Sequence, residues 1–356
     1  MSAVRRGVAG GRLTPSQRER RALQLARRDR WASDMTAVTE LEPVDTTTLH
    51  GAVVGKSPRQ LFWERFKKDK VAIAGLVIVV LLLLIAIFAG VISKYLVGHG
   101  PNELFQREMT DEFGIPLGPN GAFWFGADTA GRDLFVRVLY GARTSLLIAI
   151  VATGVAVFIG VVLGMAAGYF RGFLDTIVSR GTDIILALPL LLLAIGIAAA
   201  CGTSKEGCLG GLIEPGKWLI VVIIALFSWP YIARIVRGNV LSIREKEFIE
   251  ASRSLGAGNT RIMFREVLPN LIAPILIYAT LLIPSNVLFE AALSFLGLGV
   301  PQDEPSWGRM LADAAAVFEV AWWLMLFPGL FLIATTLAFN LLGDGLRDAL
   351  DPRTGR

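Results

Sequence analysis

Long stretches without charged side chains, separated by charged segments, set the pattern of this chain. The first covers residues 71–92, and none of its twenty-two residues is charged. A helix of that length, rising 1.5 Å per residue, is roughly 33 Å long and can cross a bilayer. Similar apolar stretches follow at residues 146–169, 184–200, 218–233, 271–298 and 320–343. The pattern predicts an all-α integral membrane protein with six transmembrane helices.

Glycine and proline modify two of these stretches. Gly160, Gly164 and Gly168 recur at every fourth position of the second stretch, which places small residues on one helix face. Such a face lets a neighbouring helix approach closely. Pro189 lies inside the third stretch and is expected to break it, because proline lacks the amide hydrogen that a helix needs.

Composition and charge placement agree with a membrane protein and predict its orientation. The chain is 54% hydrophobic with a mean hydropathy of +0.58, which is more apolar than a soluble protein of this length needs. Of its 35 lysines and arginines, 27 lie in residues 1–70, 169–183, 234–270 and 344–356. Because cytoplasmic segments retain positive residues, both termini are expected in the cytoplasm. The net charge of +5 therefore requires no nucleic-acid partner.

The same pattern divides the chain into four parts. Residues 1–57 form a basic cytoplasmic tail and linker, expected to lie near anionic membrane lipid, with docking onto a partner subunit as the alternative. Residues 58–143 hold an interfacial segment, the first transmembrane helix and a long extracytoplasmic loop. Residues 144–345 form a core with five transmembrane helices, and residues 346–356 form a cytoplasmic C-terminal tail.

Residues 244–269, here called the elbow, are strongly charged although they lie between two apolar stretches. The first limb, residues 244–255, is predicted to be an amphipathic helix with Phe248, Ala251 and Leu255 on one face. That apolar face needs a partner to cover it.

The second limb of the elbow has its own turn and capping signals. Gly256 is expected to end the first helix with a positive φ, which glycine adopts without a Cβ penalty. Asn259 is expected to cap a second short helix that runs through Phe264. Pro269 then leads into the next transmembrane stretch.

Five residues of the elbow carry a family resemblance. Glu250-Ala251, Gly256 and Leu268-Pro269 resemble the E-A-A…G…L-P cytoplasmic loop of permease subunits of ABC importers. Ser252 stands where that pattern has a second alanine, and Glu266 stands where isoleucine is usual. The resemblance implies that the elbow couples the permease to an ATPase.

Two further strings make the resemblance more specific. Residues 124–146 and residues 290–308 are similar to the second permease subunit of dipeptide, oligopeptide and nickel importers, and the similarity begins near Pro58. It implies the type I ABC importer permease fold, with half of a translocation path. It also implies a homologous permease partner, two ATPase subunits and an extracytoplasmic solute-binding protein. The expected location is a bacterial or archaeal plasma membrane.

The sequence contains no recognisable ATP-binding motif and no evident metal site. It has no G-x-x-x-x-G-K-[ST] loop, so ATP and magnesium are expected on the partner ATPase subunits, and the chain is not expected to be an enzyme. Two histidines outside the apolar stretches leave haem ligation and histidine-based metal sites without their usual ligands. Cys201 and Cys208 are both expected on the extracytoplasmic side, where a disulfide is chemically permitted. Whether the two cysteines form one is left undecided by the sequence.

Polar side chains in and beside the fifth stretch are candidates for the path. Asn286, Glu290 and Ser294 lie at i, i+4 and i+8 on one helix face. An acid within a membrane is a functional candidate, so these residues are expected to line the translocation path or its gate. The alternative is a structural pair between Glu290 and Arg132 or Arg309.

Other interpretations remain open at this point. Asp128, Arg132 and Asp133 are expected either to pair with one another in their loop or to contact substrate. The cargo is expected to be a di- or oligopeptide, with nickel chelates or oligosaccharides as the alternative. A secondary transporter would carry ion-coupling acids in inverted repeats, and a membrane scaffold would need no polar line in its bundle. Stable association with an ATPase distinguishes the importer from both.

Overall fold

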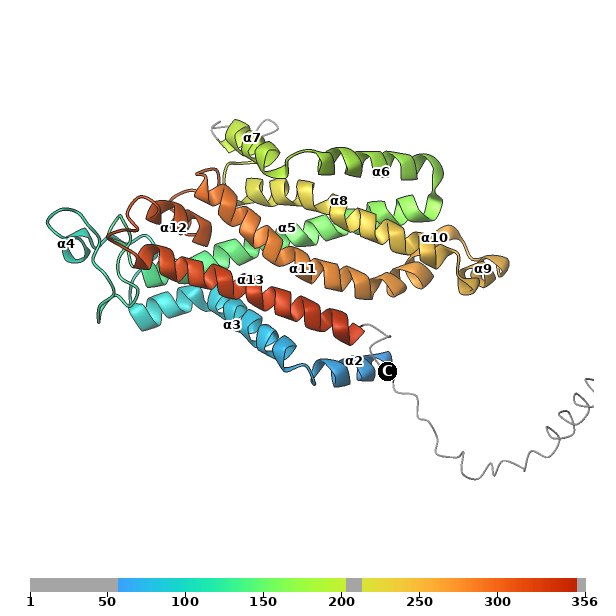
Figure 1. The fold of residues 1–356 in the computed structure, drawn as a ribbon, viewed down its shortest axis with the longest axis horizontal. Helices are drawn as coiled ribbons and strands as arrows, with labels where there is room; N and C mark the ends of the chain where they lie inside the picture. The colour runs from blue at the N-terminus through green and yellow to red at the C-terminus, as the bar shows by residue number, and fades with distance from the viewer. Residues whose placement is uncertain (1–56, 203–212, 351–356) are drawn as a thin grey trace, which may run out of the picture. The chain divides into compact units, whose positions relative to one another are not determined.

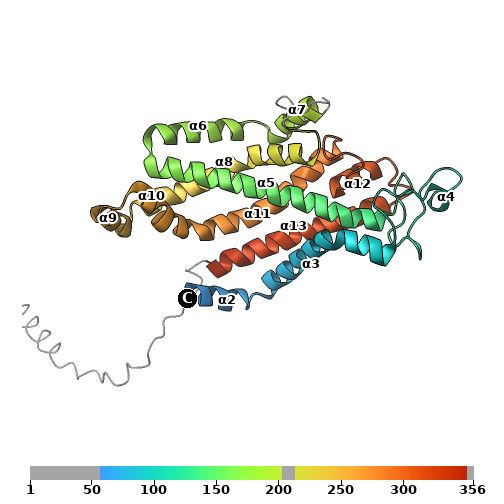
Figure 2. The ribbon, with the colours of Figure 1, turned by 180° about the vertical axis from the view of Figure 1, so that it is seen from behind.

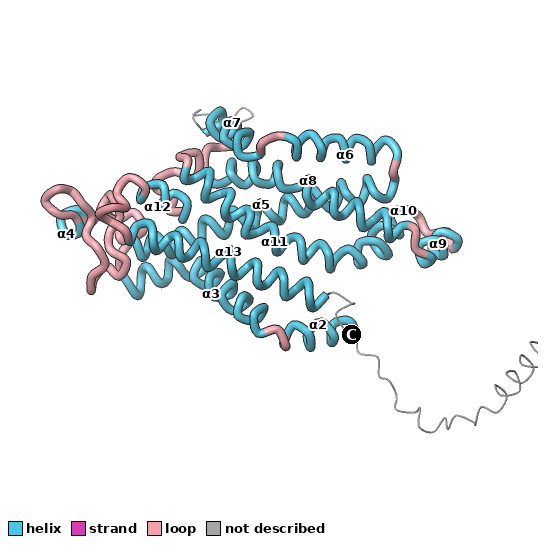
Figure 3. Tube along the Cα trace, in the orientation of Figure 1, coloured by secondary structure: helices cyan, strands magenta, loops and turns pink. Residues whose placement is uncertain are grey.

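The computed structural model describes residues 57–202 and 213–350 of the 356-residue chain. These residues are helical, apart from turns, loops and isolated β-bridges (Figure 3). The expected tail up to residue 56, Cys208 and the last six residues lie outside them. The helices in chain order are α2 Pro58–Phe66, α3 Lys70–Ile92, η3 Ser93–Val97, α4 Gln106–Met109, α5 Leu134–Phe170, α6 Gly172–Ala187, α7 Leu190–Gly202, α8 Lys217–Arg244, α9 Glu247–Ser254, α10 Asn259–Arg261, η4 Ile262–Val267, α11 Leu268–Phe295, α12 Trp307–Ala314 and α13 Trp323–Leu350.

Five helical segments of the described residues are long and apolar enough to cross a membrane. They are built on α3, α5, α8, α11 and α13. The pair α6 and α7 passes the same test as one broken span, bent by 87° between Ala187 and Leu190. The all-α membrane architecture is therefore confirmed, with six spans when the bent pair counts as one.

The break in the third span has a local cause. Proline disfavours a helical conformation in the residue before it, and Leu188 is extended, with φ −85° and ψ 144°. On one side of the break, α6 runs alongside α8 (Figure 1). The predicted connecting segment, residues 169–183, is therefore mostly helical, because α6 begins at Gly172. Arg237 on α8 binds Asp175 on α6, and Arg234 on α8 binds Asp183 at 2.7 Å.

The second span begins earlier than its hydropathy predicted, at Leu134 instead of residue 146. Asp133 fixes this start because its carboxylate accepts hydrogen bonds from the amides of Phe135 and Val136, at 2.9 and 3.3 Å. Asp69 caps α3 in the same way. The proposed boundary at residues 143 and 144 consequently falls inside α5.

The predicted glycine face of α5 is confirmed as a close helix contact. A Cβ atom on Gly160, Gly164 or Gly168 would lie within 3 Å of atoms on α8. At Gly164 the nearest of these is the carbonyl oxygen of Ala233, at 2.6 Å. Small residues therefore bring the backbones of α5 and α8 together.

Three other spans have ends that differ from the predicted ones. The fourth span continues to Arg244, which was assigned to the elbow. The fifth span is continuous with the second limb of the elbow, because Asn259–Phe295 is helical throughout. The sixth begins at Trp323 and runs to Leu350, beyond the expected end at residue 343.

The helical bundle of residues 57–350 has two unlike ends. The elbow, with α9 and α10, forms one end, called the elbow end; α4, α12 and the long loops form the other, called the loop end (Figures 1 and 2). Between them, α3, α5, α11 and α13 share a core that includes Val79, Leu146 and Val287. The two candidate sites lie at the elbow end and along α11.

Candidate functional sites: the elbow and the polar line of α11

The turn of the elbow has the backbone geometry that the sequence predicted. Helix α9 covers Glu247–Ser254, and Leu255 follows as its C-cap. Gly256 has φ +82°, and the Gly256 amide donates to the carbonyl of Arg253 at 2.9 Å. A residue with a Cβ atom is strained at this φ. The prediction for Gly256 is confirmed.

Helix α9 presents one apolar face to the bundle and another outward. Ile249 is fully buried against the bundle. Phe248 is 42% exposed and Leu255 is 89% exposed, and Ala251 is exposed beside them. Glu250 is also exposed and forms no ion pair with any described residue. The predicted apolar stripe therefore lies on the surface, while Ile249, which the sequence analysis missed, anchors the helix.

The second limb of the elbow differs from its prediction at Asn259. This residue is the first of α10 and not its cap, because its side-chain oxygen accepts a hydrogen bond from the hydroxyl of Tyr169 at 3.0 Å. The helix then passes through the π-helical η4 into α11. Leu268 is half-buried and packs against the cluster that holds Ile249, whereas Pro269 is exposed. The seven proposed coupling residues thus lie together at the elbow end.

The polar line of α11 is buried, but its two halves have different surroundings. Glu290 and Ser294 are fully buried. The hydroxyls of Ser145 and Ser294 donate to the two carboxylate oxygens of Glu290, at 2.9 and 2.7 Å. Ser145 also accepts a hydrogen bond from the amide of Trp307 at 3.3 Å. Glu290 therefore joins α5 to α11.

The alternative prediction, a pair between Glu290 and Arg132 or Arg309, is wrong. Arg132 binds Asp128 at 2.7 Å, and Arg309 pairs with Asp313 at 3.2 Å. Among the described residues, no cation forms an ion pair with Glu290. Both arginines belong to the loop end and have local partners of their own.

Asn286 is the member of the line that reaches a cavity. Its amide donates to the hydroxyl of Thr153 at 2.8 Å and accepts from Ser228 at 3.0 Å. It borders a cavity of about 340 Å³ between α8 and α11. Aromatic, aliphatic and hydroxyl side chains line this cavity and no charged one does, the aromatic members being Phe227, Tyr231, Tyr278 and Phe289. Glu290 and Ser294 are not among its lining residues.

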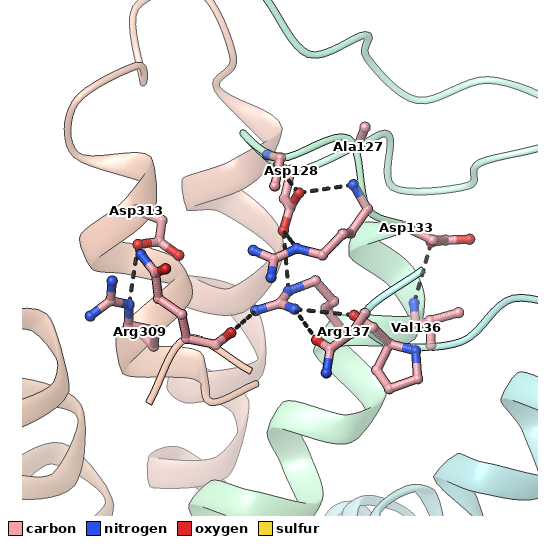
Figure 4. A network of polar contacts seen from close by, with 12 residues as sticks. Ala127, Asp128, Asp133, Val136, Arg137, Arg309 and Asp313 are labelled. Atoms are coloured by element: carbon pink, nitrogen blue, oxygen red, sulfur yellow. Dashed lines mark hydrogen bonds and ion pairs between the residues drawn. The ribbon is translucent and has the colours of Figure 1, made fainter. Parts of the chain in front are cut away.

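A buried arginine organises the loop end (Figure 4). Arg137 is 1% exposed and forms an ion pair with Asp128 at 3.2 Å. It also donates to the carbonyl of Pro101, the side chain of Asn102 and the carbonyl of Gln302, at 3.1, 3.0 and 3.4 Å. The network joins the long loop to the segment between α11 and α12.

The loop itself follows the expected internal pairing. Asp128 binds Arg132, and Asp133 contacts the ring of His99 at 2.9 Å. Arg137 was missed, although a single arginine between apolar residues at the start of a span is an available signal.

Two further observations concern metal and cysteine chemistry. Among the described ranges, no group of three or more His, Cys, Asp or Glu side chains is placed to hold a metal ion. Cys201 is disulfide-bonded in α7, whereas Cys208 lies outside the described residues.

Comparisons with known proteins agree on one class. A family model described as "Binding-protein-dependent transport system inner membrane component" matches residues 160–356. Another, described as "N-terminal TM domain of oligopeptide transport permease C", matches residues 57–104.

Individual relatives show the same likeness over most of the chain. A dipeptide transport system permease protein of Alkalihalophilus pseudofirmus is 42% identical, covering 83% of this chain and 90% of its own. A glutathione transport system permease protein of Pectobacterium atrosepticum is 40% identical, covering 84% and 92%. Among solved structures, an inward-facing form of the MetNI methionine ABC transporter has a chain with TM-score 0.51 and 20% identity, covering 61% of this chain and 98% of that chain. At that identity the likeness concerns the fold alone.

Proposed function

This chain belongs to the family of binding-protein-dependent transport system inner membrane components, and from this we propose that it imports di- or oligopeptides as one permease subunit of an ATP-driven complex. Its fold is that of an ABC importer permease. The peptide cargo is supported by relatives whose names specify dipeptide and glutathione transport. The match of residues 57–104 to an oligopeptide permease domain supports the same cargo.

The complex requires partners that supply force and cargo. We infer a homologous permease that completes the path, two ATPase subunits that carry ATP and magnesium, and an extracytoplasmic solute-binding protein. The elbow end faces the cytoplasm in this arrangement, because the basic residues of 234–270 favour that side. The loop end then faces the binding protein.

The cavity between α8 and α11 is the proposed contribution of this chain to the path. Ser228, Tyr231, Tyr278 and Asn286 offer hydrogen bonds without a fixed charge. Such a wall can contact the peptide backbone, which all peptide cargo shares, without selecting side chains by charge. Of the three residues proposed for the path, Asn286 lies at the cavity, and Glu290 and Ser294 support the helix that carries it.

The exposed apolar face of α9 is the observation that carries the proposal. Phe248 and Leu255 face outward although Ile249 holds the same helix firmly to the bundle. An apolar face that the subunit holds in place but leaves uncovered is suited to a groove on a partner protein. In the proposed complex this partner is the ATPase, and Gly256 maintains the turn of the elbow. Glu250, which is exposed and forms no ion pair with any described residue, is placed to pair with a cation of the ATPase.

The experiment is a paired substitution on this face. In Phe248→Asp with Leu255→Asp, two carboxylates enter an apolar groove, and docking should weaken by about 2 kcal/mol or more per site. The subunit should reach the membrane normally, because no spanning helix is changed. The measurement is the amount of ATPase that co-purifies with the permease, followed by peptide uptake in reconstituted vesicles.

Phe113→Asp is the matched control, since Phe113 is 88% exposed but belongs to the loop end. It should leave co-purification of the ATPase unchanged. Normal co-purification and uptake in the double elbow variant would show that the ATPase docks elsewhere, and the proposal would fail.

A further inference from the structure

Tyr169 lies at the elbow end of α5 and is 3% exposed. Its hydroxyl donates to the side-chain oxygen of Asn259 in α10, at 3.0 Å. Its carbonyl oxygen accepts a hydrogen bond from the guanidinium of Arg244, at the end of α8, at 2.6 Å. One residue of α5 therefore binds both the last residue of α8, where the elbow begins, and the first residue of α10, in its second limb.

The ring of Tyr169 adds a contact to the helix between them. The guanidinium carbon of Arg253 on α9 lies 5.6 Å from the ring centroid, and that of Arg244 lies 5.8 Å from it. Both distances are within the range of cation–π attraction. Ile249 and Ile262 of the elbow are buried in the same apolar cluster as Tyr169. All parts of the elbow thus contact this side chain or its cluster.

The position of α5 in the chain makes these contacts important. The elbow is joined covalently to α8 and to α11, so its movement reaches those helices through the backbone. Helix α5 has no such connection to the elbow. It nevertheless holds the polar line of α11 in place, through Thr153 to Asn286 and through Ser145 to Glu290.

We propose that Tyr169 is the positioning residue that joins α5 to the elbow, so that a displacement imposed by the ATPase moves α5 together with α8 and α11. The inference rests on the proposed function. Without the side-chain contacts of Tyr169 the elbow would still dock. Helix α5 would then follow only through its contacts with α8 and α11, the backbone bond from Arg244 and the exposed ion pair between Arg171 and Glu245. ATP hydrolysis would then produce less transport.

The test compares the number of peptides imported per ATP hydrolysed, measured for the whole complex in vesicles with the binding protein present. Tyr169→Phe removes only the hydroxyl, and the ratio should fall roughly two- to tenfold, the range that one hydrogen bond supports. Tyr169→Leu also removes the ring and should lower the ratio further. A residue with a merely structural role would change the yield of complex and leave this ratio constant.

Two controls sharpen the result. Tyr140→Phe makes the same chemical change nearer the loop end of α5 and should leave the ratio unaltered. Asn259→Ala should cause the same loss as Tyr169→Phe, and combining the two should add little, because both remove one hydrogen bond.

The outcomes separate this inference from the proposed function. A wild-type ratio in both Tyr169 variants, in a complex whose wild-type form couples normally, would overturn the inference alone. A wild-type complex without ATPase activity or uptake would overturn the proposed function and the inference with it.

Discussion

Glu290 shows how burial changes the interpretation of a single residue. An acid within an apolar stretch suggests a charged group on the path, but this carboxylate is fully buried and receives hydrogen bonds from two serine hydroxyls. The spacing of Asn286, Glu290 and Ser294 correctly predicted that they share one helix face. Their partners could not be predicted, because Ser145 lies 145 residues away in sequence and hydroxyls give no hydropathy signal.

Substitutions of Glu290 should reveal a structural group. Glu290→Gln keeps the size and one acceptor, and the serine hydroxyls can rotate to accept from its amide, so the melting temperature should change little. Glu290→Leu leaves both hydroxyls buried without their acceptor, which should cost about 1–3 kcal/mol for each. The melting temperature of the purified complex, together with uptake per assembled complex, checks both. Loss of uptake at unchanged stability in Glu290→Gln would place the carboxylate on the path instead.

At the scale of elements, periodicity predicted contacts better than it predicted helix ends. Three glycines spaced four residues apart identified the face of α5 that packs against α8. Hydropathy placed the start of α5 too late because the helix begins at the carboxylate cap of Asp133, and a cap is a hydrogen-bonding feature that hydropathy does not register. Similarly, Pro189 indicated a break, but its angle of 87° depends on how α6 packs along α8.

Two glycines of α5 provide a test of that packing. In Gly164→Ala the new methyl group would lie 2.6 Å from the carbonyl oxygen of Ala233, so α5 and α8 must separate, at a cost of about 1–3 kcal/mol. In Gly154→Ala the methyl group meets no atom within 4 Å. There the higher helix propensity of alanine should leave stability unchanged or raise it slightly. Thermal unfolding of the purified subunit measures both, and equal melting temperatures for the two variants would contradict the close contact.

At the scale of the molecule, the two ends of the bundle are built differently. The loop end is held by a buried arginine network in which Arg137 binds several distant segments. The elbow end is held by the apolar cluster around Ile249 and by Tyr169, and it leaves an apolar face uncovered. This asymmetry suits an importer that receives cargo at one end and force at the other. The sequence predicted the two sides from charge alone, but the contacts that hold each end come from residues far apart in the chain.

The orientation of the bundle can be tested with two matched cysteine substitutions. Phe113 at the loop end is 88% exposed and Leu255 in the elbow is 89% exposed, so their intrinsic accessibility to a reagent is nearly equal. In intact cells that produce the permease without its ATPase partner, which would otherwise cover Leu255, a membrane-impermeant maleimide should label Phe113→Cys, because we propose that the loop end faces outward. It should label Leu255→Cys only after the membrane is permeabilised, because the basic segments favour a cytoplasmic elbow. The unsubstituted protein measures the background from the native cysteines. Labelling of Leu255→Cys in intact cells, with Phe113→Cys protected, would require the opposite topology and would put the elbow on the side that lacks ATP.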